Sequence, residues 1–200
     1  MKAIQTFKIL TLAGALAVAC AAAAAQDNKQ PAMSKEQKAM MDAMQRASEV
    51  RPEHKQLNYF AGDWTTTTTT TMDPKSKSEG KAHTEAIFGG RYLRMTFEGN
   101  YEGQTFNGEG FLGFDNIKGK FFNTWIDSMS TSFWLAYGTY DSAAKSYTFK
   151  GDMDDYAKPG TKIPVRIVVH IVDPTHYTFE WNETHGGKEA KTMQIDYAKH

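Results

Sequence analysis

Residues 165–181 read VRIVVHIVDPTHYTFEW, and this stretch decides the fold class. Apolar residues occupy every second position on both sides of a turn at Asp173-Pro174. They are Val165, Ile167, Val169 and Ile171 before the turn, and Tyr177, Phe179 and Trp181 after it. A period of two places each set on one face of a strand. The stretch therefore predicts two antiparallel strands, each with one apolar and one polar face.

The same pattern continues through most of the chain. Thr65–Thr71 is a run of seven β-branched residues, which favours a strand. Turn signals such as Gly89-Gly90 and Gly186-Gly187 recur between short apolar segments. About ten strands are expected near residues 64–72, 80–88, 91–98, 105–113, 119–126, 131–140, 145–151, 163–172, 175–182 and 189–198. An uninterrupted series of hairpins predicts an all-β, antiparallel up-and-down barrel, wide enough for an internal cavity.

Composition narrows the functional classes. The 200 residues include 23 Lys and Arg, 23 Asp and Glu, and one Cys. Balanced charge argues against a nucleic-acid-binding surface, and one Cys allows neither an internal disulfide nor a Cys-based zinc site. The length and the aromatic content favour one globular domain.

The first residues have the features of an export signal. Lys2 and Lys8 precede an uncharged apolar run over residues 9–19, which is too short to span a bilayer. A signal peptide over residues 1–25, cleaved after Ala25, predicts a periplasmic or secreted protein. The alternative is a lipobox that ends at Cys20, which would anchor the protein in the membrane through a lipid.

A linker and a helix are expected over residues 26–51, before a barrel domain at 52–200. Ser34 and Gln37 fit a capping box, and the stripe containing Met40 and Met44 is expected to pack as an ordinary helix face. The alternative is a pliable binding face formed by Met40, Met41 and Met44. Pro52 suits the first turn of a second short helix. Leu57 and Phe60 would point inward from it.

Three stretches together resemble the DUF1579 family of uncharacterised bacterial proteins. They are PEHKQL (52–57) leading into FAGDW (60–64), FGGRYL (88–93), and FNGEGFLGFD (106–115) leading into TWIDS (124–128). The resemblance covers residues 52–198 and implies a calycin-like β-barrel. It implies no activity.

The Gly62-x-Trp64 step also resembles the motif that opens the first strand of lipocalins. In that family the Trp closes one end of the barrel and packs under a basic residue from a late strand. The resemblance implies that Lys191 or Lys199 has this role here.

Motifs that carry chemistry are few. Gly108-x-Gly110-x-x-Gly113 matches a phosphate-loop pattern in letters, but it lies inside a predicted strand with no helix after it. These glycines are interpreted as sites of bending or close strand packing. No cofactor and no metal are expected. The alternatives are a metal site at His83 and Glu85 or at His170 and His176, and calcium at Asp152–Asp155. A resemblance to nitrobindin-like barrels would imply haem bound through a late-strand His, for which His170, His176 and His185 are the candidates.

The predicted site is the barrel interior. Aromatic residues are expected to line it, and Arg91, Arg94 and Asp127 are expected to supply polar anchors, because Arg can pair with a carboxylate through two hydrogen bonds. A barrel filled by the same aromatic residues is the alternative. The candidate ligand-binding residues are Arg91, Arg94, Phe121, Trp125, Asp127, Phe133, Tyr137, Tyr147 and Trp181.

The sequence thus favours an exported barrel that binds a small hydrophobic or amphipathic molecule, with no nucleic-acid partner. A membrane partner is expected only if Cys20 is lipidated. The first alternative is an enzyme that uses the cavity, with Asp127 or a His as the acid–base group. This is less expected, because the common catalytic motifs are missing from the sequence. The second alternative is an envelope lipoprotein that acts through protein contacts.

Overall fold

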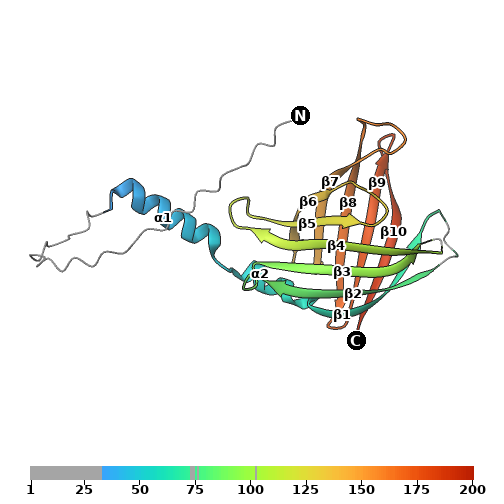
Figure 1. Cartoon of the computed structure of the whole chain (residues 1–200), viewed down its shortest axis with the longest axis horizontal. Coiled ribbons are helices and arrows are strands. Elements are labelled where there is room, and N and C mark those ends of the chain that lie inside the picture. The colour runs from blue at the N-terminus through green and yellow to red at the C-terminus, as the bar shows by residue number, and fades with distance from the viewer. Residues whose placement is uncertain (1–32, 73–74, 76, 102) are drawn as a thin grey trace, which may run out of the picture.

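The computed structural model describes residues 33–72, 75, 77–101 and 103–200. Ten antiparallel strands form a closed barrel in which each strand pairs with its neighbours in sequence and β1 pairs with β10 (Figure 1). The prediction of a ten-stranded up-and-down barrel is confirmed. The strands are β1 Gly62–Thr70, β2 Ser78–Ile87, β3 Tyr92–Tyr101, β4 Gln104–Asp115, β5 Lys120–Asp127, β6 Trp134–Asp141, β7 Ser146–Asp154, β8 Lys162–Asp173, β9 His176–His185 and β10 Lys188–Lys199. The predicted signal peptide and Cys20 lie outside the described residues.

The threonine run forms the strand that closes the barrel. Trp64 pairs with Lys199 and Thr70 with Met193 across β1 and β10. Thr66 is buried on the inner face, whereas the Thr65 hydroxyl donates a hydrogen bond to the Ala198 carbonyl. Threonine suits this position because its branched side chain favours strands on either face.

Three short helices precede the barrel: α1 Lys35–Ser48, α2 Pro52–Gln56 and the 3₁₀ helix η1 Leu57–Phe60. The predicted capping box is present, because Ser34 Oγ accepts from the Gln37 amide and Gln37 Oε1 accepts from the Ser34 amide. Pro52 occupies the first turn of α2, as predicted. Leu57 and Phe60 are buried and point into the barrel. No helix among the described residues is long and apolar enough to cross a bilayer.

One end of the barrel is closed by aromatic side chains, named here the aromatic plug: Phe60, Trp64, Tyr147, Tyr177 and Tyr197. The ring centres of Trp64 and Tyr177 lie 4.7 Å apart, and Tyr177 stacks on Tyr197 at 4.1 Å. The Trp64 indole N–H donates to the Phe60 carbonyl at 2.8 Å, which satisfies the polar atom of this buried ring. The plug therefore fills this end of the barrel.

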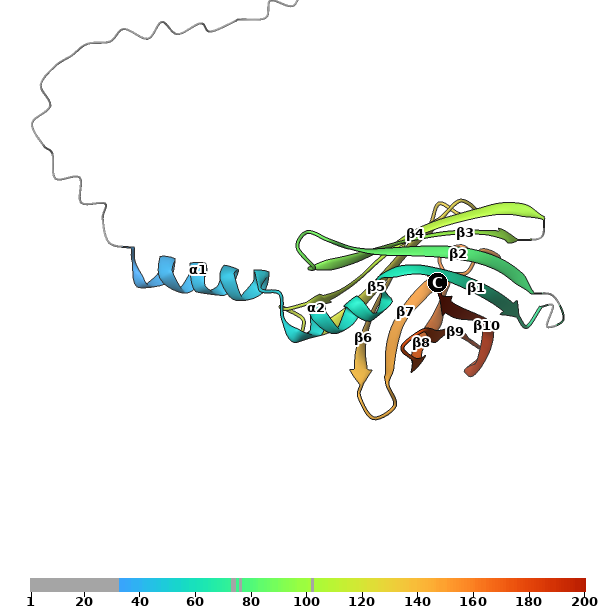
Figure 2. The ribbon, with the colours of Figure 1, turned by 90° about the horizontal axis from the view of Figure 1, so that it is seen from below.

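Helix α1 does not pack on the barrel. It extends away from the strands in two perpendicular views (Figures 1 and 2), and none of its residues is buried. The prediction that Met40 and Met44 form an ordinary packing face is therefore wrong, since both side chains are largely exposed. Their spacing gives a stripe on the helix, but the described part of the chain packs no residue against it.

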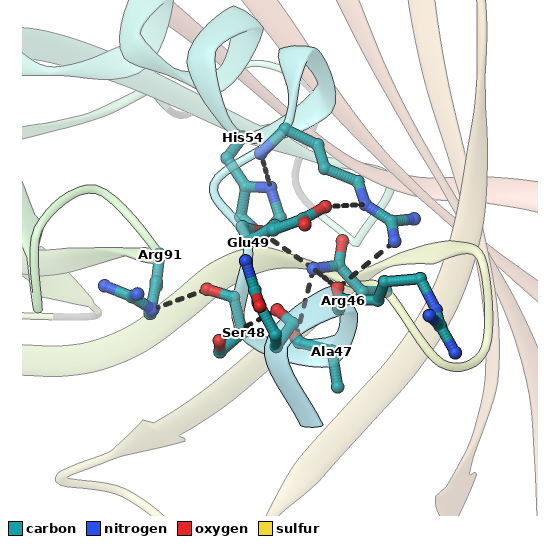
Figure 3. A network of polar contacts seen from close by, with 9 residues as sticks. Arg46, Ala47, Ser48, Glu49, His54 and Arg91 are labelled. Atoms are coloured by element: carbon teal, nitrogen blue, oxygen red, sulfur yellow. Dashed lines mark hydrogen bonds and ion pairs between the residues drawn. The ribbon is translucent and has the colours of Figure 1, made fainter. Parts of the chain in front are cut away.

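The end of α1 is nevertheless held to the barrel. The side-chain amide of Asn116, in the β4–β5 turn, donates to the carbonyls of Arg46, Ala47 and Glu49. Arg91 Nε donates to the Ser48 carbonyl at 3.1 Å (Figure 3). These contacts satisfy carbonyls that a helix C-terminus leaves free.

Candidate functional site

A cavity of about 1210 Å³ occupies the half of the barrel opposite the plug. Tyr197 belongs to both, so the plug forms the floor of the cavity. The wall is mainly aromatic and aliphatic and comes from β3, β4, β5, β7, β9 and β10. Its apolar lining residues are Met95, Phe97, Tyr101, Phe106, Trp125, Met129, Met153, Tyr156, Phe179, Trp181, Met193, Ile195 and Tyr197.

The cavity mouth is built from loops with small polar residues. Residues 128–132 between β5 and β6 supply three serines and one threonine to the lining, together with Met129. Asn100 lies at the end of β3, and Tyr156 follows β7. The Tyr156 hydroxyl lies 3.3 Å from Ser132 Oγ, which links two loops across the mouth.

Glycines in β4 explain how large rings fit in the wall. A Cβ added at Gly108 would lie 2.0 Å from Trp125 Cζ2, and one at Gly110 would lie 2.2 Å from the Thr124 carbonyl oxygen. Both distances are far below contact, so the Trp125 ring lies directly against the backbone of β4. The prediction of close strand packing at these glycines is confirmed, and the packing positions the Trp125 ring in the cavity wall.

A smaller void of about 50 Å³ lies deeper in the barrel and is lined partly by plug residues, including Phe60 and Tyr177. Met95, Asn123 and Phe179 line both spaces. The buried hydroxyl of Thr84 borders the small void and has no hydrogen-bond partner. An unpaired buried hydroxyl favours a water molecule or a ligand atom at this depth.

Among the described residues, the charged side chains that line the cavity are three carboxylates: Asp127, Asp154 and Glu183. Asp127 Oδ1 accepts from the Met129 amide at 2.9 Å. Glu183 accepts from the Trp181 indole N–H and from the Thr192 hydroxyl, each at 3.0 Å. These hydrogen bonds orient both carboxylates beside their neighbouring rings.

Three of the nine predicted site residues line the cavity: Trp125, Asp127 and Trp181. Phe121 and Tyr147 are buried beyond its floor, with ring centres 5.1 Å apart. Their inward direction was predicted, but they occupy the filled end. The barrel is therefore partly filled and partly hollow, and the two alternatives from the sequence apply to different halves.

The predicted arginine anchors lie outside the cavity, so the expectation that they face a ligand inside the barrel is wrong. Leu93 and Met95 take the inward positions on either side of Arg94, so Arg94 lies on the outer face of β3. There it pairs with Glu85. Arg91 donates to backbone carbonyls of Ser48 and Phe88 near α1.

Phe133 and Tyr137 also lie outside the cavity. Phe133 precedes β6 and is 67% exposed. In β6, Trp134 and Ala136 are buried, so Tyr137 faces outward, where the Lys118 ammonium lies 5.2 Å from its ring centre. The prediction placed Phe133 and Tyr137 on the inner face, whereas Trp134 and Ala136 occupy it. The turn residues on either side of a strand do not determine which alternate residues face inward, so the two faces were exchanged.

The site residues missed by the prediction include Met95, Phe97, Met193 and Ile195. The signal was present, because each pair alternates with polar residues along its strand. The alternation does not show where a residue lies along the barrel axis, and this position decides whether it belongs to the plug or to the cavity.

The described residues contain no group of three or more His, Cys, Asp or Glu side chains placed to hold a metal. His83 pairs with Asp63, His176 with Asp173, and Asp154 with Lys162. His83 and Glu85 therefore bind different partners. Within the described residues, neither His83 with Glu85 nor His170 with His176 belongs to a group of three such side chains.

Burial alters the titration of the plug tyrosines. Desolvation is the main cause that raises the pKa of Tyr147, Tyr177 and Tyr197 well above the ordinary value. Desolvation and the nearby Asp173 raise the pKa of Tyr59 to about 12. These phenols remain neutral at physiological pH and act as packing groups.

Comparison with known proteins agrees with the fold. The solved structure "Crystal Structure of Rv2717c from M. tuberculosis" is similar at a TM-score of 0.54 and 11% identity, over 76% of this chain and 99% of that one. A redesigned beta barrel, b11L5F_LGL, aligns at a TM-score of 0.39 and 14% identity, over 76% of this chain and 99% of that one. The structure of EF1p2_mFAP2b bound to DFHBI aligns at a TM-score of 0.40 and 10% identity, over 74% of this chain and 99% of that one.

No curated protein matches the chain. The model of the family described as "Protein of unknown function (DUF1579)" matches residues 49–199, which include both the plug and the cavity. The chain therefore belongs to the DUF1579 family.

Proposed function

We propose that this protein binds a small hydrophobic or amphipathic molecule inside its barrel. One observation carries the proposal: the cavity of about 1210 Å³ above the aromatic plug. Protein interiors are normally packed to high density, and an apolar void leaves its lining atoms without contacts. One end of this barrel is packed by the plug and the other end is hollow, which supports a bound molecule in the hollow half.

The distribution of polar groups supports an amphipathic ligand. Rings such as Phe97, Phe106 and Phe179 line the wall, whereas serine, threonine and asparagine side chains gather at the mouth. Ligand sites typically combine an apolar lining with a few polar groups that fix orientation. An apolar portion would lie along the wall, with the polar portion at the mouth loops.

We also propose that the protein acts after export, with its N-terminus at Gln26 or at a lipidated Cys20. The proposal rests on the charged and apolar pattern of residues 1–25. The intact mass of the protein purified from its native envelope fraction tests it. A full-length mass that retains Met1 in that fraction would contradict both forms.

Binding is tested by native mass spectrometry of the same preparation, followed by titration with the apolar fluorophore N-phenylnaphthylamine. We expect a co-purified small molecule, or fluorophore binding that saturates at one site. A blocked variant, Met95→Trp with Met193→Trp, places large rings in the cavity and is expected to abolish binding.

The matched control is Ile126→Trp with Leu135→Trp, because both of these residues are exposed on the barrel exterior. This control should bind like the unmodified protein. Fluorophore binding that survives in the blocked variant, while circular dichroism confirms its fold, would place the binding site elsewhere. A protein that binds neither a native ligand nor the fluorophore would contradict the proposed function.

A further inference from the structure

The charge of the cavity restricts the ligand further. Among the described residues its lining includes three carboxylates and no Lys, Arg or His. Asp154 at the rim is already paired with Lys162. Asp127 and Glu183 therefore determine the electrostatic character of the interior.

Asp127 and Glu183 occupy equivalent positions on two strands. In β5, Trp125 and Asp127 are two residues apart and both line the cavity, and in β9 Trp181 and Glu183 do the same. Residues two apart on a strand share a face. Each inward carboxylate thus has an inward indole ring directly below it on the same strand.

Neither carboxylate is neutralised from inside the cavity. Asp127 uses Oδ1 to accept the Met129 amide, and its other oxygen has no partner among the described residues. Glu183 is oriented by Trp181 and Thr192, and its other oxygen lies 2.8 Å from Nε2 of the exposed His185, which is not part of the cavity lining. The space between the indoles and the carboxylates can therefore accept positive charge.

The chemistry of these groups favours a cation. Aromatic faces attract ammonium groups, most strongly in the case of Trp, and a carboxylate adds direct charge pairing. A carboxylate or phosphate head group would lose its hydration beside like charges, with no cationic side chain in the cavity lining to compensate. Fatty-acid-like ligands are thus disfavoured.

We propose that the ligand is a cationic amphiphile, with an amine or quaternary ammonium group held in the part of the cavity lined by the two indole–carboxylate pairs, Trp125 with Asp127 and Trp181 with Glu183, and an apolar portion against the cavity wall. This inference rests on the proposed binding function and specifies its ligand class. Of the three polar anchors expected from the sequence, only Asp127 faces the cavity, so the arginine side chains that could pair with a carboxylate do not face a ligand there.

The test compares dodecyltrimethylammonium with dodecanoate, which carry the same alkyl chain and opposite head-group charge. Both are titrated into the mature protein by calorimetry, below their micelle concentrations, at neutral pH and low salt. We expect the ammonium compound to bind at least about tenfold more tightly, with a preference that falls as salt is added.

A charge-removed variant, Asp127→Asn with Glu183→Gln, should reduce this preference to near parity. Its matched control is Glu98→Gln with Asp152→Asn, which removes the same charge at exposed positions on β3 and β7. The control should keep the preference of the unmodified protein. The preference is also measured in the unmodified protein, so it remains testable if the variant does not fold.

The outcomes separate the two proposals. Equal affinity for the two compounds, or tighter binding of dodecanoate, overturns the cationic ligand class and leaves the binding function in place. A preference that persists in a folded charge-removed variant also overturns it, because the selecting charge then lies elsewhere. Binding of neither compound, together with failure of the neutral fluorophore, overturns both.

Discussion

The ammonium of Lys199 lies 5.1 Å from the centre of the Trp64 ring, and the two residues are directly opposed in the register of β1 and β10. Gly62 provides room for this contact, because a Cβ at that position would lie 3.1 Å from Lys199 Cε. Its φ of +116° also favours glycine. The last strand is thus joined to the first where the barrel closes.

We predict that Lys199→Met lowers the free energy of unfolding by about 0.5–1 kcal/mol, because it keeps an apolar stem and removes the cation over the ring. Trp64→Ala should cost about 3–5 kcal/mol, since it removes a fully buried ring from the plug. Urea unfolding measures both. Lys188→Met in the exposed β9–β10 hairpin is the control, and a loss there as large as at Lys199 would refute a specific ring contact.

Much of the fold could be predicted from the sequence because strand alternation and turn residues are local. All ten strands and the capping box of α1 were predicted in this way. Lys199 as the partner of Trp64 came from the resemblance to lipocalins, with Lys191 as the alternative. Lys191 instead pairs with Glu180.

The candidate site was less predictable because it depends on which alternate residues of each strand face inward and on where each residue lies along the barrel axis. Asp127 does face the cavity, since it follows the inward Trp125 at a spacing of two. Arg94 was assigned inward although Leu93 and Met95 alternate around it, because an Arg anchor was expected inside. Tyr147 pointed inward as predicted but lies beyond the cavity floor.

The contact between Gly108 and the Trp125 ring gives a second prediction. Gly108→Ala would place a Cβ 2.0 Å from the ring, so the indole must shift. We expect a loss of about 1–3 kcal/mol in stability from overpacking, with a changed near-ultraviolet circular dichroism signal and weaker fluorophore binding. Asn107→Ala, at the adjacent exposed position, is the control. Unchanged spectra and binding in Gly108→Ala would mean that the ring does not lie against this strand.

Asn116 gives a third prediction, about the attachment of α1. Asn116→Ala removes three hydrogen bonds to carbonyls at the end of the helix, at 3.3, 3.1 and 2.8 Å. We expect faster amide exchange across residues 35–48, because no residue of α1 is buried and the Asn116 bonds are three of the contacts that tie its end to the barrel. The melting temperature of the barrel should change little. Ile117→Ala, which alters a neighbouring exposed residue, should leave exchange in α1 unchanged. Equal exchange in the two variants would contradict this role for Asn116.

His54 links α2 to the barrel and predicts how stability depends on pH. Its Nδ1 accepts the Arg51 amide at 3.1 Å, and its ring meets the Phe114 ring edge-on at 5.8 Å. Burial is the main cause that lowers the pKa of His54 below its usual 6.5. The unfolded chain therefore binds a proton first as the pH falls, so stability is full above about pH 6.5 and decreases below it until the folded pKa is reached.

His54→Gln should reduce this loss of stability between neutral and mildly acidic pH, at the cost of lower stability at neutral pH where the Arg51 hydrogen bond is lost. Urea unfolding at several pH values in this range measures the slope for each variant. His170→Gln, an exposed histidine on β8, should keep the slope of the unmodified protein. If His54→Gln and His170→Gln have the same slope, another group must cause the acid sensitivity, because only a group with different pKa values in the folded and unfolded chains contributes to it.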